Sequence, residues 1–141
     1  MAIPVWVEKY IGLPFKVKGR DRSGIDCWGL VLLVTFEQQA VVMPAFDKGY
    51  DGTYAPDDAA KIGNIVKTVG PISTVIPAGQ EKCFDVIVLR LKGQPMHVGI
   101  VLGDGIMLHI ESGIESCIES YHSMRWKDRI YGIYRYAPSG N

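Results

Sequence analysis

Hydrophobic residues change their spacing along the chain, and the first 40 positions favour helices. A short helix or turn is expected over residues 5–10, and a longer helix from Cys27 to about Gln39. Asp26 directly precedes the longer helix and can cap it through a side-chain oxygen. Positions 28–36 are apolar on every side, which predicts a helix buried all round at the centre of the fold.

Residues 41–80 form a second zone, a connection in which glycines and prolines recur. One amphipathic helix is expected inside it, because four aliphatic residues between positions 62 and 69 follow the i, i+3, i+4, i+7 spacing of a helix face. A connection of this length usually shapes the edge of a binding site. A shorter polar loop is expected over residues 16–23.

Residues 83–136 form a third zone, in which the spacing predicts an antiparallel sheet. The expected strands cover residues 86–89, 97–102, 106–110 and 129–136. The first is apolar throughout, which predicts burial on both of its faces. Helices followed by an antiparallel sheet indicate an α+β fold. A chain of 141 residues suits one hydrophobic core, so residues 1–141 are expected to form a single domain.

The hairpin formed by the second and third strands carries the most informative local pattern. Its large apolar residues occupy even positions on both strands, within residues 98–102 and 106–110. Both sets can face one core only if paired positions have an even sum, which requires a loop with an odd number of residues. We therefore expect a three-residue loop, Gly103-Asp104-Gly105, with Gly105 at positive φ.

The other face of this hairpin would bring two histidines together. Gly99 would lie directly opposite His109, and His97 would be its diagonal neighbour at about 7–8 Å between backbones, within reach of two imidazoles. Met107 and Glu111 share this face with them. The same pattern is also compatible with two unrelated histidines on a partly exposed strand, so the interpretation depends on what else lies nearby.

Cys27 occupies the first turn of the predicted buried helix, where the helix dipole and free N–H groups stabilise a thiolate and lower its pKa. A catalytic cysteine also needs a histidine base and a third polar group that fixes the ring. Cys27, His97 and His109 can take these roles in that order. The alternative is a buried, unreactive thiol, and this interpretation is favoured for Cys83 and Cys117, which start no predicted helix.

Composition and charge narrow the range of partners. Lys plus Arg and Asp plus Glu each total 15. A net charge of zero lacks the excess of positive charge that is typical of proteins that bind nucleic acid or an anionic membrane. The longest apolar run, residues 27–36, is about half of what a bilayer-spanning helix needs, so no membrane insertion is expected. The first residues do not follow the pattern of a secretory signal peptide, which favours a soluble protein made in the cytoplasm.

The cysteines and histidines do not suggest a disulfide or a metal. Three cysteines that lie far apart argue against a disulfide framework in such a chain. A zinc site formed from the three cysteines and three histidines is conceivable, but none of the six shows the spacing of a ligand pair. We therefore expect no metal, and we expect His122, which has no partner in the pattern, at the surface.

Two blocks of the sequence, in the right order, resemble blocks of a known family. Residues 24–31 read Gly-Ile-Asp-Cys-Trp-Gly-Leu-Val, and residues 97–105 read His-Val-Gly-Ile-Val-Leu-Gly-Asp-Gly and are followed by Met-Leu-His at 107–109. They are similar to the nucleophile block and the histidine block of the NlpC-type cell-wall peptidases. Gly-Leu-Pro-Phe at 12–15 adds a shorter match. The resemblance touches most of the chain outside residues 41–80.

The resemblance implies a papain-like α+β fold, with the nucleophile at the N-terminus of a buried helix packed on a C-terminal antiparallel sheet. It implies a thiol endopeptidase that cleaves peptidoglycan stem peptides, typically between D-glutamate and a diamino acid, with no metal or organic cofactor. By position, Cys27 would be the nucleophile, His97 the base and His109 the orienting residue.

Three further residues, Phe15, Asp26 and Trp28, would line the substrate site. Phe15 stands where the family often has a tyrosine whose hydroxyl serves the oxyanion hole or the substrate, so the hole would rely on backbone N–H groups such as that of Cys27. Trp28 replaces a common serine in the region that recognises the stem-peptide amino end. Cys-Phe-Asp at 83–85 replaces Pro-Gly-Asp before the first core strand, which is a structural change only.

Trp28 and the missing signal peptide are similar to the short versions of the family that are associated with phage tail tips. We therefore expect a component of a virion tail that reaches the cell wall with the phage and has other tail-tip proteins as partners. The alternative function is a structural or assembly subunit of the tail that retains the peptidase fold with little activity. A third interpretation, an acyl-transferring relative that uses the same thiol, has no acyl-carrier or lipid feature to support it.

Overall fold

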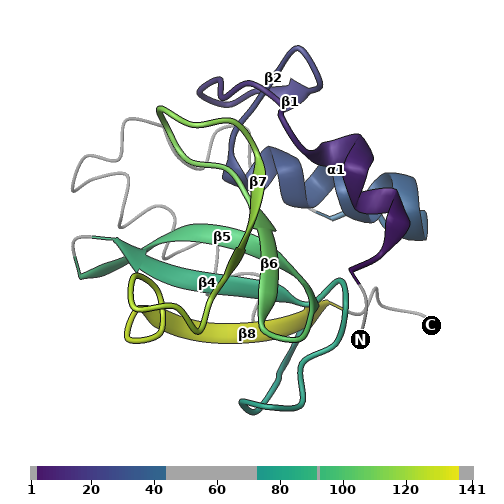
Figure 1. Ribbon diagram of the computed structural model, residues 1–141. Coiled ribbons are helices and arrows are strands. Elements are labelled where there is room, and N and C mark those ends of the chain that lie inside the picture. Colours follow the sequence, from purple (N-terminus) through teal and green to yellow (C-terminus); the bar gives the residue numbers. More distant parts are fainter. Residues whose placement is uncertain (1–2, 44–72, 92, 137–141) are drawn as a thin grey trace.

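The structure, a computed structural model, describes residues 3–43, 73–91 and 93–136 of the chain. The helix α1 (Cys27–Gln39) lies against an antiparallel sheet (Figure 1). The α+β fold predicted from the order of helices and strands is therefore confirmed. The amphipathic helix expected between residues 57 and 69 lies outside the described residues.

The main sheet has six strands in the order β3-β8-β4-β5-β6-β7, and every neighbouring pair is antiparallel. Its strands are β3 (Ser73–Val75), β4 (Val86–Leu91), β5 (Gln94–Gly103), β6 (Ile106–His109), β7 (Cys117–Ser120) and β8 (Ile130–Tyr136). The sequence pattern predicts β4, β5, β6 and β8. It misses β3 and β7, because segments of three and four residues show no clear alternation.

The N-terminal part adds two small elements to this sheet and helix. The 3-10 helix η1 (Val5–Tyr10) confirms the short helix expected there. The segment expected as a polar loop instead contains a small hairpin, β1 (Arg20–Asp21) paired with β2 (Gly24–Ile25). Polar side chains suit this hairpin because Arg20 and Asp21 are only partly covered.

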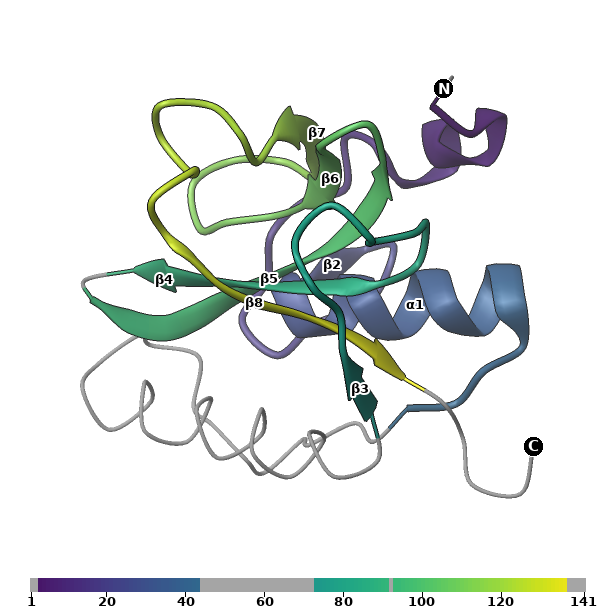
Figure 2. The same cartoon turned by 90° about the horizontal axis from the view of Figure 1, so that it is seen from below.

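Two hydrophobic cores lie on opposite faces of the sheet, because successive residues of a strand point to opposite sides. The helix-side core packs α1 against β4, β5 and β6; its buried members include Cys27, Leu30, Val31, Val34, Val86, Val88, Val98, Ile100, Leu102, Leu108 and Ile110. The far-side core comprises Ile76, Ile87, Leu89, Val101, Met107, Tyr121, Trp126 and Ile133. Figure 2 shows α1 running along the first of these faces.

Strand β4 contributes to both cores, which confirms the prediction that its first four residues are buried on both faces. The exposed fraction stays at 8% or less from Val86 to Leu89. Its neighbours β5 and β8 flank it on both edges, so its backbone hydrogen bonds are also covered.

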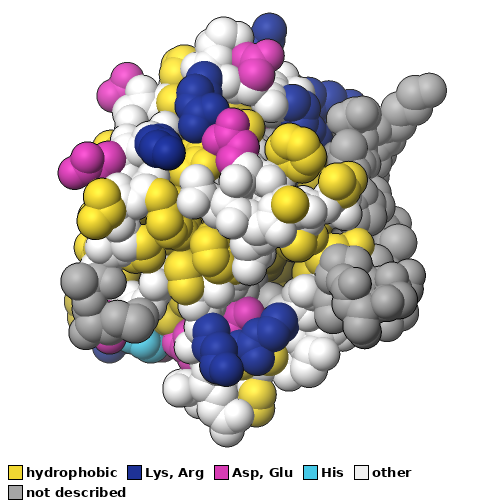
Figure 3. Space-filling model, turned by 90° about the vertical axis from the view of Figure 1, so that its right-hand side faces the viewer, with side chains coloured by type: hydrophobic (Ala, Val, Ile, Leu, Met, Phe, Trp, Pro, Cys, Tyr) yellow, Lys and Arg dark blue, Asp and Glu magenta, His cyan; other side chains and the backbone are white. Residues whose placement is uncertain are grey.

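The prediction that α1 is buried all round is wrong. Leu30, Val31 and Val34 are buried against the sheet, whereas Phe36 is 59% exposed. Figure 3 shows hydrophobic side chains at the surface on the side of the molecule where α1 lies. The helix forms an outer layer on one sheet face, with η1 and the β1–β2 hairpin packed beside it. The sheet alone therefore does not bury every apolar position of the helix.

The β5–β6 hairpin confirms the predicted faces but not the predicted loop. Ile100 pairs with Leu108, as the even sum requires. Gly103 pairs with Ile106 after a shift in register, so the loop has only two residues, Asp104-Gly105, and a β-bulge absorbs the odd residue. Their φ values are 52° and 75°, which suits a type I′ turn. The prediction of positive φ at Gly105 is thus confirmed. The β-bulge keeps the even positions of both strands on one face, as a third loop residue would have done.

No helix in the described part of the chain is long and apolar enough to cross a membrane.

Candidate active site

Asp26 fixes the start of α1. Its Oδ1 accepts hydrogen bonds from the Gly29 backbone N–H at 2.8 Å and from Arg20 Nη1 at 2.8 Å. Its Oδ2 accepts one from the Lys18 backbone N–H at 3.1 Å. Asp26 is 2% exposed, so the predicted helix cap is confirmed and holds Cys27 in the first turn. A contact between Asp26 and a substrate stays a prediction.

His97 and His109 lie side by side, as the hairpin pattern predicts. Nε2 of His97 lies 2.8 Å from Nδ1 of His109, and both side chains are almost fully buried. Gly99 makes room for them: a Cβ added there would lie 3.2 Å from the Leu108 carbonyl oxygen and 3.3 Å from His109 Cβ. The alternative of two unrelated, partly exposed histidines is therefore excluded.

The expected hydrogen bond between Cys27 and His97 is not formed. Nδ1 of His97 is buried and has no hydrogen-bond partner among the residues that the structure describes. His97 stacks on Trp126 of the far-side core at 5.5 Å, whereas Cys27 belongs to the helix-side core. His97 occupies an odd position of β5 and so lies on the strand face opposite to Val98. The approach of the Cys27 sulfur to His97 stays a prediction.

Phe15 and Trp28, the two aromatic residues expected at the substrate site, pack around the start of the helix. Phe15 is half-buried against the helix-side core, and its backbone bridges to Ile25. Trp28 is 7% exposed. Both therefore help to hold the segment that carries Cys27. Contact of either ring with a substrate stays a prediction.

Burial keeps both histidines neutral near pH 7. Desolvation holds the pKa of His97 well below its usual range, and the nearby His109 and Arg125 lower it further. Burial also lowers the pKa of His109, although Glu119 and Glu111 oppose this effect. A neutral imidazole can accept a proton, which is what a general base requires.

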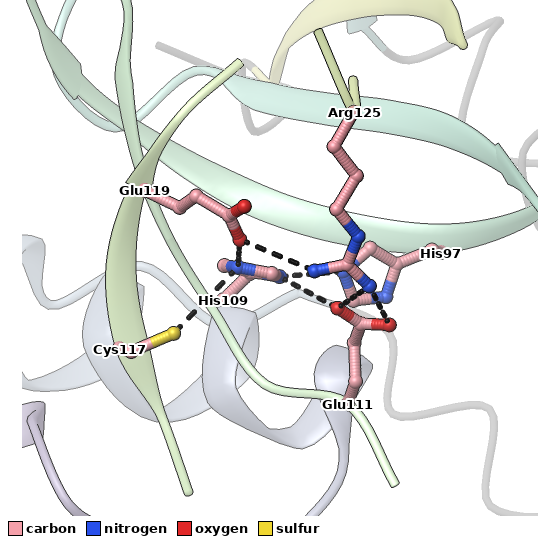
Figure 4. Close-up of polar contacts among 6 residues, drawn as sticks. All are labelled: His97, His109, Glu111, Cys117, Glu119 and Arg125. Atoms are coloured by element: carbon pink, nitrogen blue, oxygen red, sulfur yellow. Dashed lines mark hydrogen bonds and ion pairs between the residues drawn. The ribbon is translucent and has the colours of Figure 1, made fainter. Parts of the chain in front are cut away.

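Several polar groups around His109 were not predicted from the sequence. Oε1 of Glu119 lies 2.8 Å from His109 Nε2 (Figure 4). Arg125 contacts Glu111 at 2.7 Å and Glu119 at 3.5 Å, and its guanidinium lies 4.4 Å from the Trp126 ring. Glu111 is the exception, because the hairpin parity places it on the histidine face.

The two remaining cysteines are not activated. Burial has the largest effect on the pKa values of Cys83 and Cys117 and raises both, so both remain thiols near neutral pH. Sγ of Cys117 lies 3.8 Å from Nε2 of His109, a contact that the sequence does not predict. The interpretation of both residues as unreactive thiols agrees with these shifts, although both are only half-buried.

Two clusters near His109 bring together side chains that can ligate metals. His97, His109 and Glu111 form one, and His109, Cys117 and Glu119 form the other; the ligand atoms of each lie within 4.8 Å of one another. Arg125 forms ion pairs with the carboxylate of each cluster. Because this guanidinium already places a positive charge there, the two donor sets fit a metal ion poorly.

Comparisons with known proteins identify a sequence family and solved structures with a similar fold. The sequence model of the NlpC/P60 family matches residues 12–135. A sequence comparison with curated proteins gives no match. Among solved structures, the NlpC/p60 domain of the peptidoglycan hydrolase SagA is 22% identical with a TM-score of 0.60, and the match covers 94% of this chain and 92% of that one.

Two further structures show the same fold. An NlpC/P60 family protein of Bacillus cereus is 18% identical with a TM-score of 0.66; the match covers 93% of this chain but only 38% of that protein. The P60 domain of an antigen from Mycobacterium avium subspecies paratuberculosis is 20% identical with a TM-score of 0.56, covering 92% and 88% of the two chains. The chain thus matches isolated domains over most of their length and less than half of the larger protein.

Proposed function

The chain belongs to the NlpC/P60 family, and from this premise we propose that it is a thiol hydrolase that cleaves peptide bonds in peptidoglycan stem peptides. The observation that carries the proposal is the buried, neutral His97–His109 pair, in which Nδ1 of His97 has no hydrogen-bond partner in the described part of the chain. The similarity to the domain of a peptidoglycan hydrolase supports the substrate class.

The proposed reaction uses Cys27 as nucleophile and His97 as base. Nδ1 of His97 takes the proton of the Cys27 thiol, and the sulfur attacks the scissile carbonyl carbon. The imidazolium then gives its proton to the leaving amine as the C–N bond breaks, and water hydrolyses the thioester in a second step through the same base. His109 holds the His97 ring throughout. The sulfur must approach Nδ1 when substrate binds, since such contacts are often long in unliganded enzymes.

The negative charge that develops on the carbonyl oxygen needs hydrogen-bond donors. Phe15 has no side-chain donor, so the backbone N–H groups at the start of α1, including that of Cys27, are the groups available in this proposal. Free N–H groups at a helix N-terminus favour negative charge at that point. The Asp26 side chain accepts a hydrogen bond from the Gly29 N–H and so fixes the start of α1, where these groups lie.

The finer part of the proposal is that the protein acts as a phage tail-tip component, made in the cytoplasm and incorporated in a virion. Trp28, which stands where many relatives have serine, supports it. Mass spectrometry of purified virions tests this part, because the protein should be found in tails. Its absence from tails would leave the hydrolase proposal in place and remove the virion role.

A second candidate function is a structural or assembly subunit of a phage tail that keeps the fold with little activity. The missing hydrogen bond between Cys27 and His97 favours it, because Nδ1 of His97 engages no partner among residues 3–43, 73–91 and 93–136. In this case the wild-type protein would bind other tail proteins but would release nothing from cell walls.

Purified sacculi distinguish the two functions. The wild type should release muropeptides with new peptide ends, identified by mass spectrometry, and Cys27→Ala should release none. Cys83→Ala is the matched control, because Cys83 is half-buried and its thiol is not activated. If the wild type is folded and releases nothing from sacculi of several peptidoglycan types, the hydrolase proposal is wrong and the structural function is favoured.

A further inference from the structure

Glu119 contacts the nitrogen of His109 that faces away from His97. Its Oε1 lies 2.8 Å from Nε2 of His109. Strand β7 delivers it there by register: Cys117 pairs directly with His109, and Glu119 lies two residues further on the same strand face. Figure 4 shows both side chains of β7 pointing toward the His109 ring.

The hydrogen-bond donors and acceptors along Glu119, His109 and His97 have one consistent order. An ionised carboxylate only accepts hydrogen bonds, so Nε2 of His109 carries a proton and donates it to Glu119. A neutral His109 then has its lone pair on Nδ1, which lies 2.8 Å from Nε2 of His97. Nε2 of His97 therefore carries the proton of that ring, and the lone pair of His97 resides on Nδ1.

We propose that Glu119 is a positioning residue that fixes the proton order of both histidines, so that the buried Nδ1 of His97 presents a lone pair. Nδ1 of His97 has no hydrogen-bond partner among the residues that the structure describes, which is compatible with this order. Only the meaning of this lone pair, as the base for a thiol, rests on the proposed function. The proton order itself is a property of the resting protein.

Two neighbouring groups do not compete with Glu119 for this role. Oε1 of Glu111 lies 4.0 Å from Nδ1 of His109, and both oxygens of Glu111 accept hydrogen bonds from Arg125 at 2.7 and 2.8 Å. The Cys117 sulfur lies 3.8 Å from Nε2 of His109, whereas the Glu119 oxygen lies at 2.8 Å. A short contact with a charged acceptor is the stronger of the two.

Arg125 and Trp126 restrain this arrangement. Arg125 lies 3.5 Å from the Glu119 carboxylate and packs over the Trp126 ring. Trp126 in turn stacks on His97 at 5.5 Å and meets His109 edge-on at 5.7 Å. The carboxylate and both rings are thus restrained by neighbouring groups, which is what a defined proton order requires.

Protonation of His109 would reverse the order. A doubly protonated His109 donates from Nδ1 to Nε2 of His97, which moves the His97 proton to Nδ1 and removes the lone pair there. Burial of His109 opposes this protonation, and the Glu119 carboxylate favours it. Glu119 therefore determines which nitrogens of the neutral pair carry protons, and burial keeps the pair neutral.

Nitrogen-15 NMR of labelled histidine side chains tests the inference without any hydrolysis. The wild type near pH 7 should show His97 and His109 both protonated at Nε2. Glu119→Leu removes the acceptor and should give a mixture of tautomers at both rings. Glu119→Gln keeps an acceptor oxygen and should restore the wild-type tautomers. Glu115→Leu is the charge-matched control, because Glu115 is exposed and precedes β7.

Two outcomes would overturn the inference. One is a wild type in which His109 is protonated at Nδ1, which can be read even if the Leu variant fails to fold. The other is a folded Glu119→Leu protein with unchanged tautomers. Failure of the proposed function is distinguishable, since an inactive wild type with the expected tautomers would refute only the hydrolase role.

Where sacculi are hydrolysed, a kinetic measurement adds a second readout. Glu119→Leu should lower kcat about tenfold or more while KM changes little, as expected for an outer partner of a histidine ring. Glu119→Gln should recover most of that loss. A rise in KM with unchanged kcat would place Glu119 in substrate binding and would contradict the positioning role.

Discussion

The two faces of the β5–β6 hairpin differ in the side chains that they carry. The face toward α1 carries aliphatic side chains such as Val98, Ile100 and Leu108, packed in the helix-side core. The opposite face carries His97 and His109, buried among aromatic and charged neighbours. One pair of strands thus carries an aliphatic core on one side and a buried histidine pair on the other, because side chains alternate along a strand.

This difference predicts where substitutions act. Removal of a buried aliphatic group costs transfer and cavity free energy and lowers stability. Removal of a histidine deletes a proton-transfer group and, through its partners, affects chemistry more than packing. Effects on hydrolysis should therefore come from Cys27 and the histidine face, and effects on unfolding from the helix face.

The largest effect should come from Cys27→Ala. Without the nucleophile, release of muropeptides from sacculi should fall by at least about 1000-fold. The free energy of unfolding, measured with urea, should change little because alanine still fits the first helical turn. Iodoacetamide near neutral pH should modify Cys27 before Cys83 or Cys117, whose pKa values are raised. Faster labelling of Cys117 would reject Cys27 as the activated thiol.

The two histidines should differ in their contributions to the rate. His97→Ala removes the proposed base and should reduce kcat nearly as much as Cys27→Ala. His109→Ala removes only its support and should cost about 10- to 100-fold. His122→Ala, at the exposed third histidine, serves as the control. Near-full activity of His97→Ala would contradict the thiolate–imidazolium scheme, and equal losses at both positions would contradict the division of roles.

The sequence predicts the parts of the site that depend on regular periodicity. The alternation in β5 and β6 is sufficient to place His97 and His109 on one face, because parity needs no knowledge of the rest of the fold. The capping side chain of Asp26 is likewise a local feature, and it places Cys27 at the start of α1. These predictions hold in the structure, even though a bulge replaces the third loop residue.

Other parts of the site depend on contacts between distant segments. Glu119 reaches His109 only because β7 pairs with β6, and a four-residue strand has too little pattern to reveal that pairing. Arg125 and Trp126 come from the turns after β7 and have no periodic signal. The relation between Cys27 and His97 depends on how α1 docks on the sheet, which is set by tertiary packing rather than by either local segment.

Among stability effects, Leu30→Ala should be the largest. Leu30 is 1% exposed in the helix-side core, and its truncation should lower the free energy of unfolding by about 2–5 kcal/mol. Leu32→Ala on the half-buried side of the same helix is the matched control and should cost clearly less. Urea unfolding measures both. Similar losses in the two variants would show that the two sides of α1 are covered equally, contrary to the exposed Phe36.

Stability should also depend on pH through the histidine pair. The pKa of His97 lies well below the value of about 6.5 in an unfolded chain, so only the unfolded state binds its proton just below pH 6.5. The free energy of unfolding is therefore full above pH 6.5 and falls below it, by up to about 1.4 kcal/mol per pH unit for each buried histidine.

Urea unfolding at pH 7.5 and pH 5.5 measures this slope. Glu37, whose pKa is lowered to about 2, does not titrate in this interval. His122→Gln is the comparison variant, because that residue is exposed in the folded protein. His97→Gln should reduce it. Equal unfolding free energies at both pH values in the wild type would show that the two histidines are not buried in neutral form.

The smallest effect should come from substitutions at Asp26. They distinguish its role as a helix cap from a contact with the substrate. Asp26→Ala removes the acceptor of the Gly29 N–H and should destabilise the protein by about 1–2 kcal/mol. Asp26→Asn keeps an acceptor oxygen and should lose less, mainly through the ion pair with Arg20. Urea unfolding and sacculus hydrolysis should be measured on both variants. If Asp26 only caps the helix, KM in Asp26→Asn stays unchanged; a raised KM in this folded variant would show that the carboxylate contacts substrate.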